Sequence, residues 1–225
     1  MKIEEYLSTL PQSILSGEEI QIPPDSIREI FRLVDLEKND TFYHLGCGDG
    51  TSLSIARQEF NVKDAVGIDN SKKMIDIAKK KIKEENVTNA KLIEQDILNA
   101  ELDNADVILC WFMDVEILEK MMDKFKKLRD DVRIITIWAP LPGCIPQKVD
   151  FPYILNKTPF VETDDLKEQL LAVFETECIG FVTAWEYAER YTKSIGRDNP
   201  ENDRFLVIIQ ALTIWINAKN LGVAC

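Results

Sequence analysis

Short strand-forming runs alternate with stretches of helical periodicity over the first 140 residues, and this alternation constrains the fold most. Five runs rich in β-branched, aliphatic and aromatic residues predict buried strands at residues 41–45, 65–69, 90–94, 105–112 and 133–138. Apolar residues at intervals of three and four predict helices after Ser26, over 51–60, after Ser71 and over 114–128. Strands that alternate with helices form a mostly parallel sheet with helices on both faces. The sequence therefore predicts an α/β fold.

The pattern changes after the fifth strand. Residues 140–160 contain five prolines and little periodicity, which predicts either an irregular loop or an extra edge strand. One apolar stripe then continues past residue 166, as a single long helix or as two helices broken at Gly180. Gly196 is placed to end this section, and Pro200 to begin a last helix that Gly222 closes.

These features divide the chain in two. We predict an α/β domain over residues 1–160, in which residues 1–24 form an N-terminal segment, and a helical C-terminal extension over residues 161–225. The 225 residues are 45% hydrophobic and 29% charged, a composition that permits a globular core.

Charge and cysteine content narrow the classes of partner. A net charge of −12 argues against nucleic acid, which proteins bind largely through Lys and Arg. The lysines between residues 72 and 83 are interpreted as the solvated face of a helix.

Five cysteines without CxxC spacing and a single histidine argue against a metal site. No apolar run reaches the ~20 residues of a membrane-spanning helix. We expect a cytoplasmic protein in a reducing compartment.

A glycine-rich segment follows the first predicted strand. Gly46, Gly48 and Gly50 alternate within the sequence HLGCGDG. Glycines between a strand and a helix let the backbone approach a ligand closely. A nicotinamide fingerprint has the spacing G-x-G-x-x-G, whereas the third glycine here comes one residue earlier. The segment is either a ligand-binding loop or a structural turn.

Acidic residues follow the next two predicted strands. Asp69 ends the second strand, where a carboxylate can accept hydrogen bonds from both hydroxyls of a ribose or can cap the next helix. Asp96 follows the third strand, where it can accept from the exocyclic amine of adenine or lie in a solvated turn. The three strand ends together predict a nucleoside site at the carboxyl edge of the sheet.

The segments HLGCGDG, VGIDNS and EQDIL resemble the first three motifs of class I S-adenosylmethionine-dependent methyltransferases. The resemblance covers roughly residues 22–138 and is closest to small archaeal-type enzymes with a DLGCGDG-like loop, some of which modify protein lysines. It implies a Rossmann-like methyltransferase fold with the strand order 3-2-1-4-5 and S-adenosylmethionine as cofactor. It implies that the cofactor contacts these residues: Gly46, Cys47, Gly48, Gly50, Asp69, Asn70, Asp96, Ile97 and Trp111.

His44 departs from that pattern. The residue two before the first glycine is usually acidic in the family and helps to bind the methionine end. A neutral imidazole could accept a hydrogen bond from the cofactor's ammonium group, whereas a protonated one would repel it. The two interpretations are a pH-sensitive cofactor contact, which weakens in acid, and a histidine packed at the strand end.

The methyl acceptor is expected at the ends of the fourth and fifth strands. Trp111 and Trp138 could wall the site or hold a cation. Asp114 could orient or deprotonate an amine as the catalytic residue, or could cap the following helix. The absence of an Asn-Pro-Pro-Tyr element argues against methylation of adenine or glutamine nitrogen. We expect transfer to a protein lysine or to a small-molecule nucleophile.

Two alternatives stay open from the sequence. One is an NAD-dependent oxidoreductase, and the other is a protein that binds or senses the cofactor without catalysis. The C-terminal aromatic residues Trp185, Tyr187 and Tyr191 could cover the site or contact a second subunit, so a homodimer through the C-terminal helices is possible.

Overall fold

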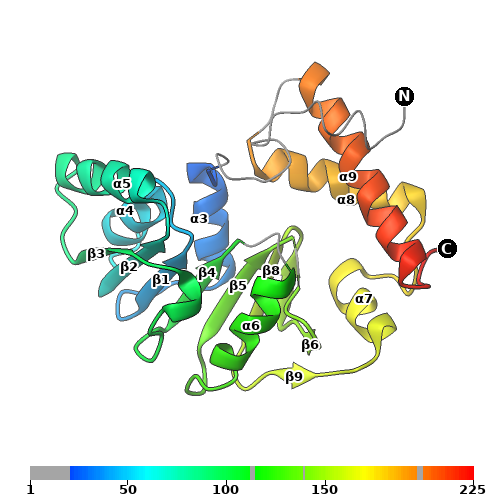
Figure 1. Cartoon of the computed structure of the whole chain (residues 1–225), viewed down its shortest axis with the longest axis horizontal. Coiled ribbons are helices and arrows are strands. Elements are labelled where there is room, and N and C mark those ends of the chain that lie inside the picture. The colour runs from blue at the N-terminus through cyan, green and yellow to red at the C-terminus, as the bar shows by residue number, and fades with distance from the viewer. Residues whose placement is uncertain (1–20, 112–114, 139, 197–199) are drawn as a thin grey trace.

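The computed structural model describes residues 21–111, 115–138, 140–196 and 200–225 (Figure 1). A seven-stranded sheet has the order β3-β2-β1-β4-β5-β8-β7, and β6 and β9 form a separate pair. The first five strands are parallel, β8 runs antiparallel to β5, and β7 runs antiparallel to β8. The strands are β1 Thr41–Leu45, β2 Asp64–Asp69, β3 Ala90–Glu94, β4 Val107–Cys110, β5 Arg133–Ile137, β6 Cys144–Ile145, β7 Lys148–Asp150, β8 Tyr153–Lys157 and β9 Val161–Glu162. The expected Rossmann-like α/β fold and the order 3-2-1-4-5 are confirmed.

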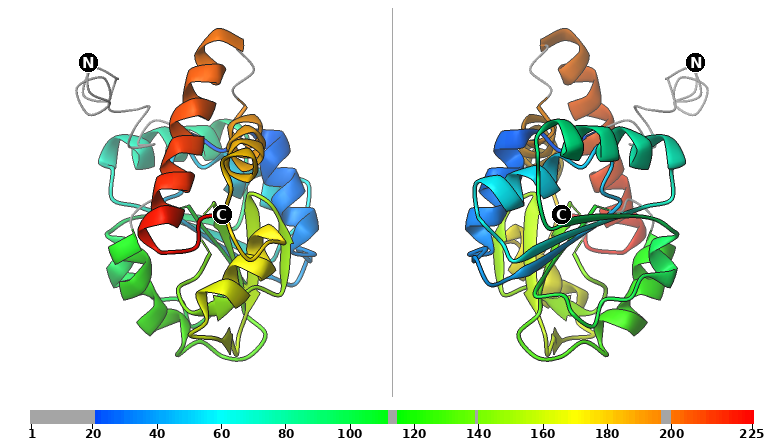
Figure 2. Two further views of the ribbon diagram at one scale, coloured as in Figure 1. Left: turned by 90° about the vertical axis from the view of Figure 1, so that its right-hand side faces the viewer. Right: turned by 90° about the vertical axis from the view of Figure 1, so that its left-hand side faces the viewer.

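Helices cover both faces of this sheet. Figure 2 shows α3 and α6 on opposite sides of the strands. Side chains of α3, α4 and α5 pack on one face in a large apolar core, and α6 and η1 pack on the other. The helices are α3 Pro24–Leu33, α4 Thr51–Gln58, α5 Lys72–Glu84, η1 Ile97–Asn99, α6 Val115–Phe125, α7 Leu166–Phe174, α8 Phe181–Ser194 and α9 Pro200–Asn220.

Local sequence explains the boundaries of these elements. In β1, residues 42–45 are all buried, as expected for a central strand of a parallel sheet that has helices on both faces. The hydroxyl of Ser71 accepts a hydrogen bond from the backbone N–H of Met74 and begins α5, as predicted. Pro24 occupies the first turn of α3, where its missing N–H costs nothing.

Residues 140–160 form more regular structure than an irregular loop. They contribute β8 and β7, which extend the sheet beyond β5, and β6, which pairs with β9. Of the two expectations for this segment, an irregular loop or an extra edge strand, the edge strand therefore describes the structure better. Because β6 and β9 lie on either side of residue 160, the division of the chain at that residue stays a prediction.

The C-terminal region is helical, as expected. The apolar stripe is broken before α8, which begins directly after Gly180. Gly196 and Gly222 follow α8 and α9 with φ angles of 70° and 72°, the left-handed conformation that commonly ends a helix. Helices α8 and α9 pack together at the upper right of Figure 1, and Tyr187 and Tyr191 of α8 belong to the same core as α3.

Cysteines near the end of the chain differ from the expectation of reduced thiols. Cys178 and Cys225 form a disulfide, and backbone hydrogen bonds between Ile179 and the last residues lie beside it. Cys47, Cys110 and Cys144 are free and buried.

Within the described ranges, no helix has the length and apolarity needed to cross a membrane, and no cluster of metal-ligating side chains is present.

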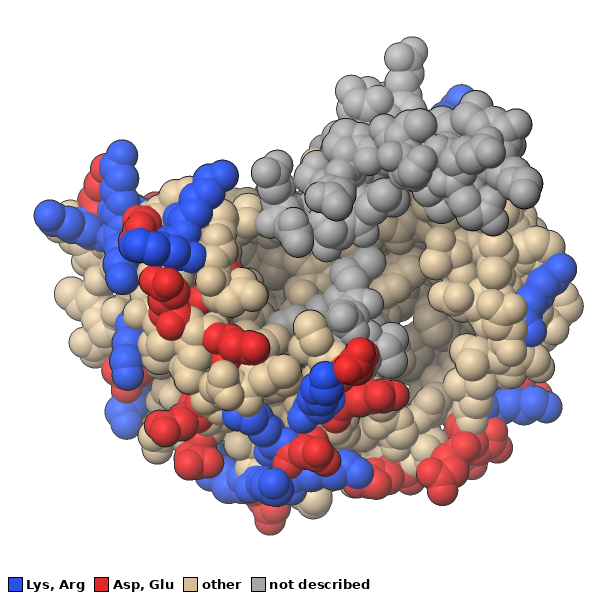
Figure 3. Space-filling model, viewed as in Figure 1, with Lys and Arg blue, Asp and Glu red and all other residues tan. Residues whose placement is uncertain are grey.

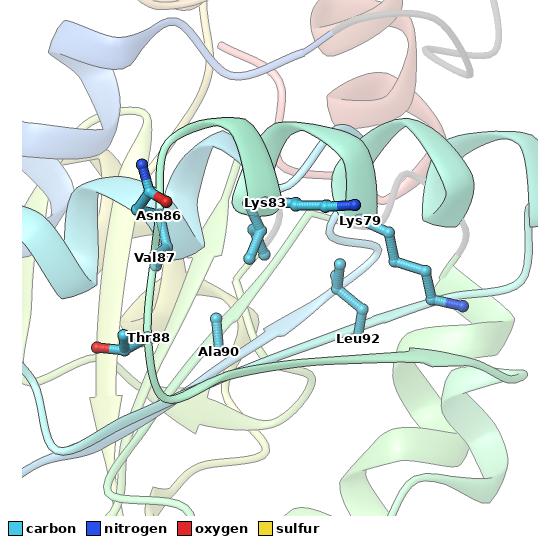
Figure 4. Close-up of a pocket in the computed structure, with 8 residues that line it drawn as sticks. Lys79, Lys83, Asn86, Val87, Thr88, Ala90 and Leu92 are labelled. Carbon is cyan, nitrogen blue, oxygen red and sulfur yellow. The ribbon is translucent and has the colours of Figure 1, made fainter.

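A surface groove lies at the outer edge of the sheet. It has a volume of about 380 Å³ and lies between α5 and β3 (Figure 4). Lys79 and Lys83 flank it, and Val87 and Leu92 line its apolar part. Most of its lining residues belong to the turn before β3 or to the start of that strand. The groove is therefore distinct from the carboxyl edge where the nucleoside site is predicted.

Candidate functional site

The glycine loop connects β1 to α4 in a left-handed backbone conformation. Gly46, Gly48 and Gly50 have φ angles of 78°, 54° and 77°. Side chains rarely adopt such angles, which explains the alternating glycines. The N–H groups of Gly46 and Cys47 donate to the carbonyl of Ile68 at 2.8 and 3.0 Å. These bonds fix the loop to the end of β2.

Gly48 is buried in this loop, whereas Gly46 is exposed. The atoms nearest to a Cβ placed on Gly48 would belong to the side chain of Gln21, whose Oε1 accepts a hydrogen bond from the Asp49 N–H at 3.2 Å. The flexible amide end of Gln21 therefore lies against Gly48. Gln21 is not predictable from the sequence as part of the site, because no local pattern brings it to the loop.

Asp69 lies directly beside the loop. Its carboxylate is buried and accepts hydrogen bonds from the N–H of Gly48 at 2.9 Å and from the N–H of Ser71 at 2.8 Å. The structure therefore brings Gly48 and Asp69 together, as the nucleoside site requires. The bond to Ser71 shows that Asp69 also helps to begin α5, which was the alternative role.

Asp96 and its neighbours lie at the end of β3. Asp96 is exposed, and its Oδ1 accepts from the N–H of Leu98 at 2.9 Å and begins η1. Asn70 is exposed and Ile97 is half-buried. The N–H of Gln95 donates to the carbonyl of Asp69 at 3.0 Å, which holds the ends of β2 and β3 together. These predicted adenine contacts are therefore adjacent to the predicted ribose contact.

His44 is buried beneath the loop. Its Nδ1 lies 2.6 Å from the hydroxyl of Ser52 on α4. Burial lowers the pKa of His44 to about 4, and the more distant charge of Asp49 opposes this only in part. The ring is therefore neutral between pH 5.5 and 8. Desolvation of the ring favours the second interpretation, a histidine packed at the strand end, over a pH-sensitive contact, and His44 as a cofactor contact stays a prediction.

The side chain of Cys47 is buried against β2. Its sulfur packs against Gly67 of β2, where a Cβ would lie 2.8 Å from it. Burial raises the pKa of Cys47 to about 12, so the thiol stays protonated. Any cofactor contact by this residue would use its backbone.

Lys81 of α5 forms hydrogen bonds with residues that follow the second glycine of the loop. Lys81 donates to Asp49 at 2.9 Å and also to the hydroxyl of Thr51. Burial alone would raise the pKa of Asp49, but the hydrogen bonds from Lys81 and Thr51 outweigh it and lower the pKa. Lys81 is therefore an exception to the interpretation of these lysines as a solvated face.

Aromatic side chains lie at the ends of β4 and β5. Trp111 follows β4 and Trp138 follows β5, and both are half-buried. Tyr191 of α8 lies 4.6 Å from Trp138 and 6.4 Å from Trp111 between ring centroids. Trp185 instead donates its indole N–H to Glu189 on the same helix at 3.0 Å. Asp114, the predicted catalytic residue, lies outside the described residues.

Comparison with known proteins agrees with this geometry. Residues 44–148 match the family described as the ANTKMT methyltransferase domain. A protein-lysine N-methyltransferase of Saccharolobus islandicus is 26% identical over 131 residues, which are 58% of this chain and 81% of that protein. An RNA methyltransferase of Salinibacter ruber, solved with S-adenosyl-L-homocysteine, shares the fold with a TM-score of 0.60 and 21% identity over 65% of this chain and 99% of that one.

The matched residues begin at His44 and contain the glycine loop, Asp69 and Asp96. The chain is a class I S-adenosylmethionine-dependent methyltransferase. The predicted cofactor class is thereby confirmed, and the oxidoreductase and the non-catalytic sensor are not favoured.

The methyltransferase site fits this cofactor by its own geometry. The glycine loop exposes Gly46, and the buried carboxylate of Asp69 is bonded to the N–H of Gly48 in the same loop. Carboxylate oxygens have further lone pairs, so Asp69 can accept from sugar hydroxyls while it holds the loop.

Proposed function

We propose that this methyltransferase methylates the side-chain amine of a protein lysine. The contact between Asp69 and Gly48 supports the cofactor site, and the similarity to a protein-lysine N-methyltransferase supports the acceptor. A small-molecule amine is the second acceptor class. Identification of the labelled amino acid distinguishes these two acceptor classes.

The residues of the site take defined roles in this proposal. The backbone of the glycine loop lies under the amino-acid part of S-adenosylmethionine, with Gly46, Cys47, Gly48 and Gly50 in contact. Asp69 holds the ribose hydroxyls. Asn70, Asp96 and Ile97 surround the adenine. Trp111 borders the cofactor on the side of β4. When bound, the cofactor would supply a methyl group on its sulfonium. The amine lone pair of the acceptor would bond to the methyl carbon while the carbon–sulfur bond breaks and S-adenosylhomocysteine leaves as a neutral thioether.

The acceptor side has different requirements. The nucleophile must be an uncharged amine, and an apolar surrounding favours that form because it disfavours the ammonium ion. Asp114 is kept as the group that orients or deprotonates the amine. The net charge of −12 favours the approach of a cationic protein and disfavours nucleic acid.

Two further parts of the proposal concern the whole protein. Val182 of α8 is 72% exposed and Leu221, directly after α9, is 62% exposed, and a homodimer would bury such apolar surface. Light scattering of the full chain tests this, and a monomer at micromolar concentration would contradict it.

A cytoplasmic location is also part of the proposal, although disulfides are rare in the cytoplasm. Cell fractionation tests the location.

Transfer of tritiated methyl groups tests the acceptor. The protein is incubated with labelled S-adenosylmethionine and a protein fraction, and the products are hydrolysed to amino acids. Label in methylated lysines supports the proposal. Label in nucleic acid or in small molecules alone would contradict it. The matched control is Asp69→Ala, which should bind the cofactor poorly and transfer little label.

A further inference from the structure

The side chain of Gln21 lies on the glycine loop, although the two are far apart in the sequence. A Cβ added to Gly48 would collide with the Gln21 Oε1 and would lie 2.9 Å from its Nε2. The Oε1 accepts a hydrogen bond from the N–H of Asp49 at 3.2 Å. A side-chain amide therefore covers the loop at Gly48, two residues from the exposed Gly46.

The segment that follows Gln21 is held in place by packing. Ile22 is buried in the large apolar core, and Pro23 and Pro24 lead into α3. A Cβ on Gly196, at the end of α8, would lie 2.9 Å from the Pro23 ring. Because proline fixes its own φ angle, this segment is rigid. The amide of Gln21 thus reaches the loop from a fixed base, as a binding residue requires.

The amide of Gln21 has donors that the protein does not use. A backbone N–H can only donate, so the bond from Asp49 identifies the oxygen of the amide, and the Nε2 carries two further N–H donors. Among the residues that the structure describes, none accepts a hydrogen bond from this Nε2. Gln21 is only half-buried, so a ligand at the loop can reach it.

Charges around the loop indicate which ligand group would use these donors. Asp49 and Asp69 are acidic, and His44 is buried and neutral. Lys81 already donates to Asp49 and to the hydroxyl of Thr51. Lys and Arg side chains over α5 project outward at the upper left of Figure 3. A carboxylate bound at this loop therefore depends on uncharged N–H donors.

S-Adenosylmethionine carries a carboxylate on its amino-acid part. We infer that the Nε2 of Gln21 donates a hydrogen bond to this carboxylate while the Oε1 keeps its bond to Asp49. Gln21 is then a cofactor-binding residue outside the three sequence motifs. The inference rests on the proposed position of the amino-acid part at the glycine loop, and it is independent of the methyl acceptor.

Two ligands that differ in one group test this contact without catalysis. They are S-adenosylhomocysteine and decarboxylated S-adenosylhomocysteine, which lacks only the carboxylate, and both are titrated calorimetrically into the full chain. Gln21→Ala should bind S-adenosylhomocysteine roughly tenfold more weakly than the wild type does, because it loses a hydrogen bond to a charged group. Its affinity for the decarboxylated ligand should change little.

Gln21→Glu separates recognition of the ligand from support of the loop. Glutamate can still accept from the Asp49 N–H, but it puts a negative charge where the amide donates. It should therefore weaken S-adenosylhomocysteine more than alanine does and spare the decarboxylated ligand. The matched control is Gln58→Ala at the far end of α4, where the amide donates to the carbonyl of Glu85. This variant should bind both ligands as the wild type does.

The outcomes distinguish this inference from the proposed function. Equal losses for the two ligands in Gln21→Ala would overturn the inference, because Gln21 would then only support the loop. Unchanged or tighter binding of S-adenosylhomocysteine by that variant would also overturn it. Failure of lysine labelling in the tritium assay would instead contradict the proposed acceptor, and full cofactor affinity of Asp69→Ala would contradict the proposed ribose contact.

Discussion

The carboxylate of Asp69 accepts a hydrogen bond from the backbone N–H of Gly48 across 2.9 Å. This bond joins the end of β2 to the glycine loop after β1. It places a buried carboxylate beside the glycine backbone of the loop. The contributions of Asp69 and Gly48 to cofactor binding can be tested separately.

Replacing Asp69 by asparagine should weaken the binding of S-adenosylhomocysteine roughly tenfold to a hundredfold. The substitution keeps the shape but removes the charge, and hydrogen bonds to a charged group contribute about 1.5–3 kcal/mol. Calorimetric titration measures the affinity. Asp96→Asn is the matched control at the exposed end of β3, where a smaller loss is expected. Equal affinities of the wild type and Asp69→Asn for S-adenosylhomocysteine would show that the charge of Asp69 does not contribute to cofactor binding.

Alanine at Gly48 should harm both folding and cofactor binding. The φ angle of 54° costs any other residue about 1–2 kcal/mol, and the new Cβ would displace Gln21. Gly222→Ala is the control, since Gly222 also has a positive φ but nothing within 4 Å of a Cβ. Both variants should unfold at lower urea concentrations. Only Gly48→Ala should lose affinity for S-adenosylhomocysteine, by roughly tenfold or more.

The stability of the protein should fall in mild acid because of His44. Its pKa is about 4 in the folded protein and near 6.5 when exposed, so the unfolded chain binds more protons between these values. Its contribution is complete above pH 6.5 and is lost as the pH falls towards 4. The loss between pH 6.5 and pH 5 should be about 1.5 kcal/mol.

Urea unfolding at several pH values measures this effect. His44→Gln removes the only histidine, so its unfolding free energy should decrease less between pH 6.5 and pH 5. Parallel pH profiles for the two proteins would contradict the prediction. Cofactor affinity should not change through His44 between pH 5.5 and 8, because the ring is neutral throughout.

Breaking the bond between Cys178 and Cys225 should destabilise the protein by about 2–4 kcal/mol. The disulfide closes a loop with a sequence separation of 47, which restricts the unfolded chain. Unfolding of Cys178→Ser, Cys225→Ser and the double variant measures the loss. All three should be equally unstable and insensitive to reductant, whereas reductant should destabilise the wild type. A wild type that reductant does not affect would show that the bond contributes nothing.

Local signals determined the elements of the sheet. The strands at 41–45 and 90–94 have the predicted boundaries, and Ser71, Gly180 and Gly196 begin or end helices where expected. Such features depend on residues a few positions apart, so a sequence states them directly. The pairing of β6 with β9 was not predicted, because it joins short strands separated by a proline-rich segment.

The sequence by itself determined the alternation of strands and helices, the glycine loop and the two acids at the strand ends, because periodicity and glycine spacing are local properties. Only the tertiary structure decided that Gln21 lies over Gly48, that His44 is neutral against Ser52, and that Tyr191 meets Trp138. The contacts of Gln21 and Tyr191 join residues far apart in the chain, and burial sets the pKa of His44. Packing therefore decided which of the predicted residues share one site.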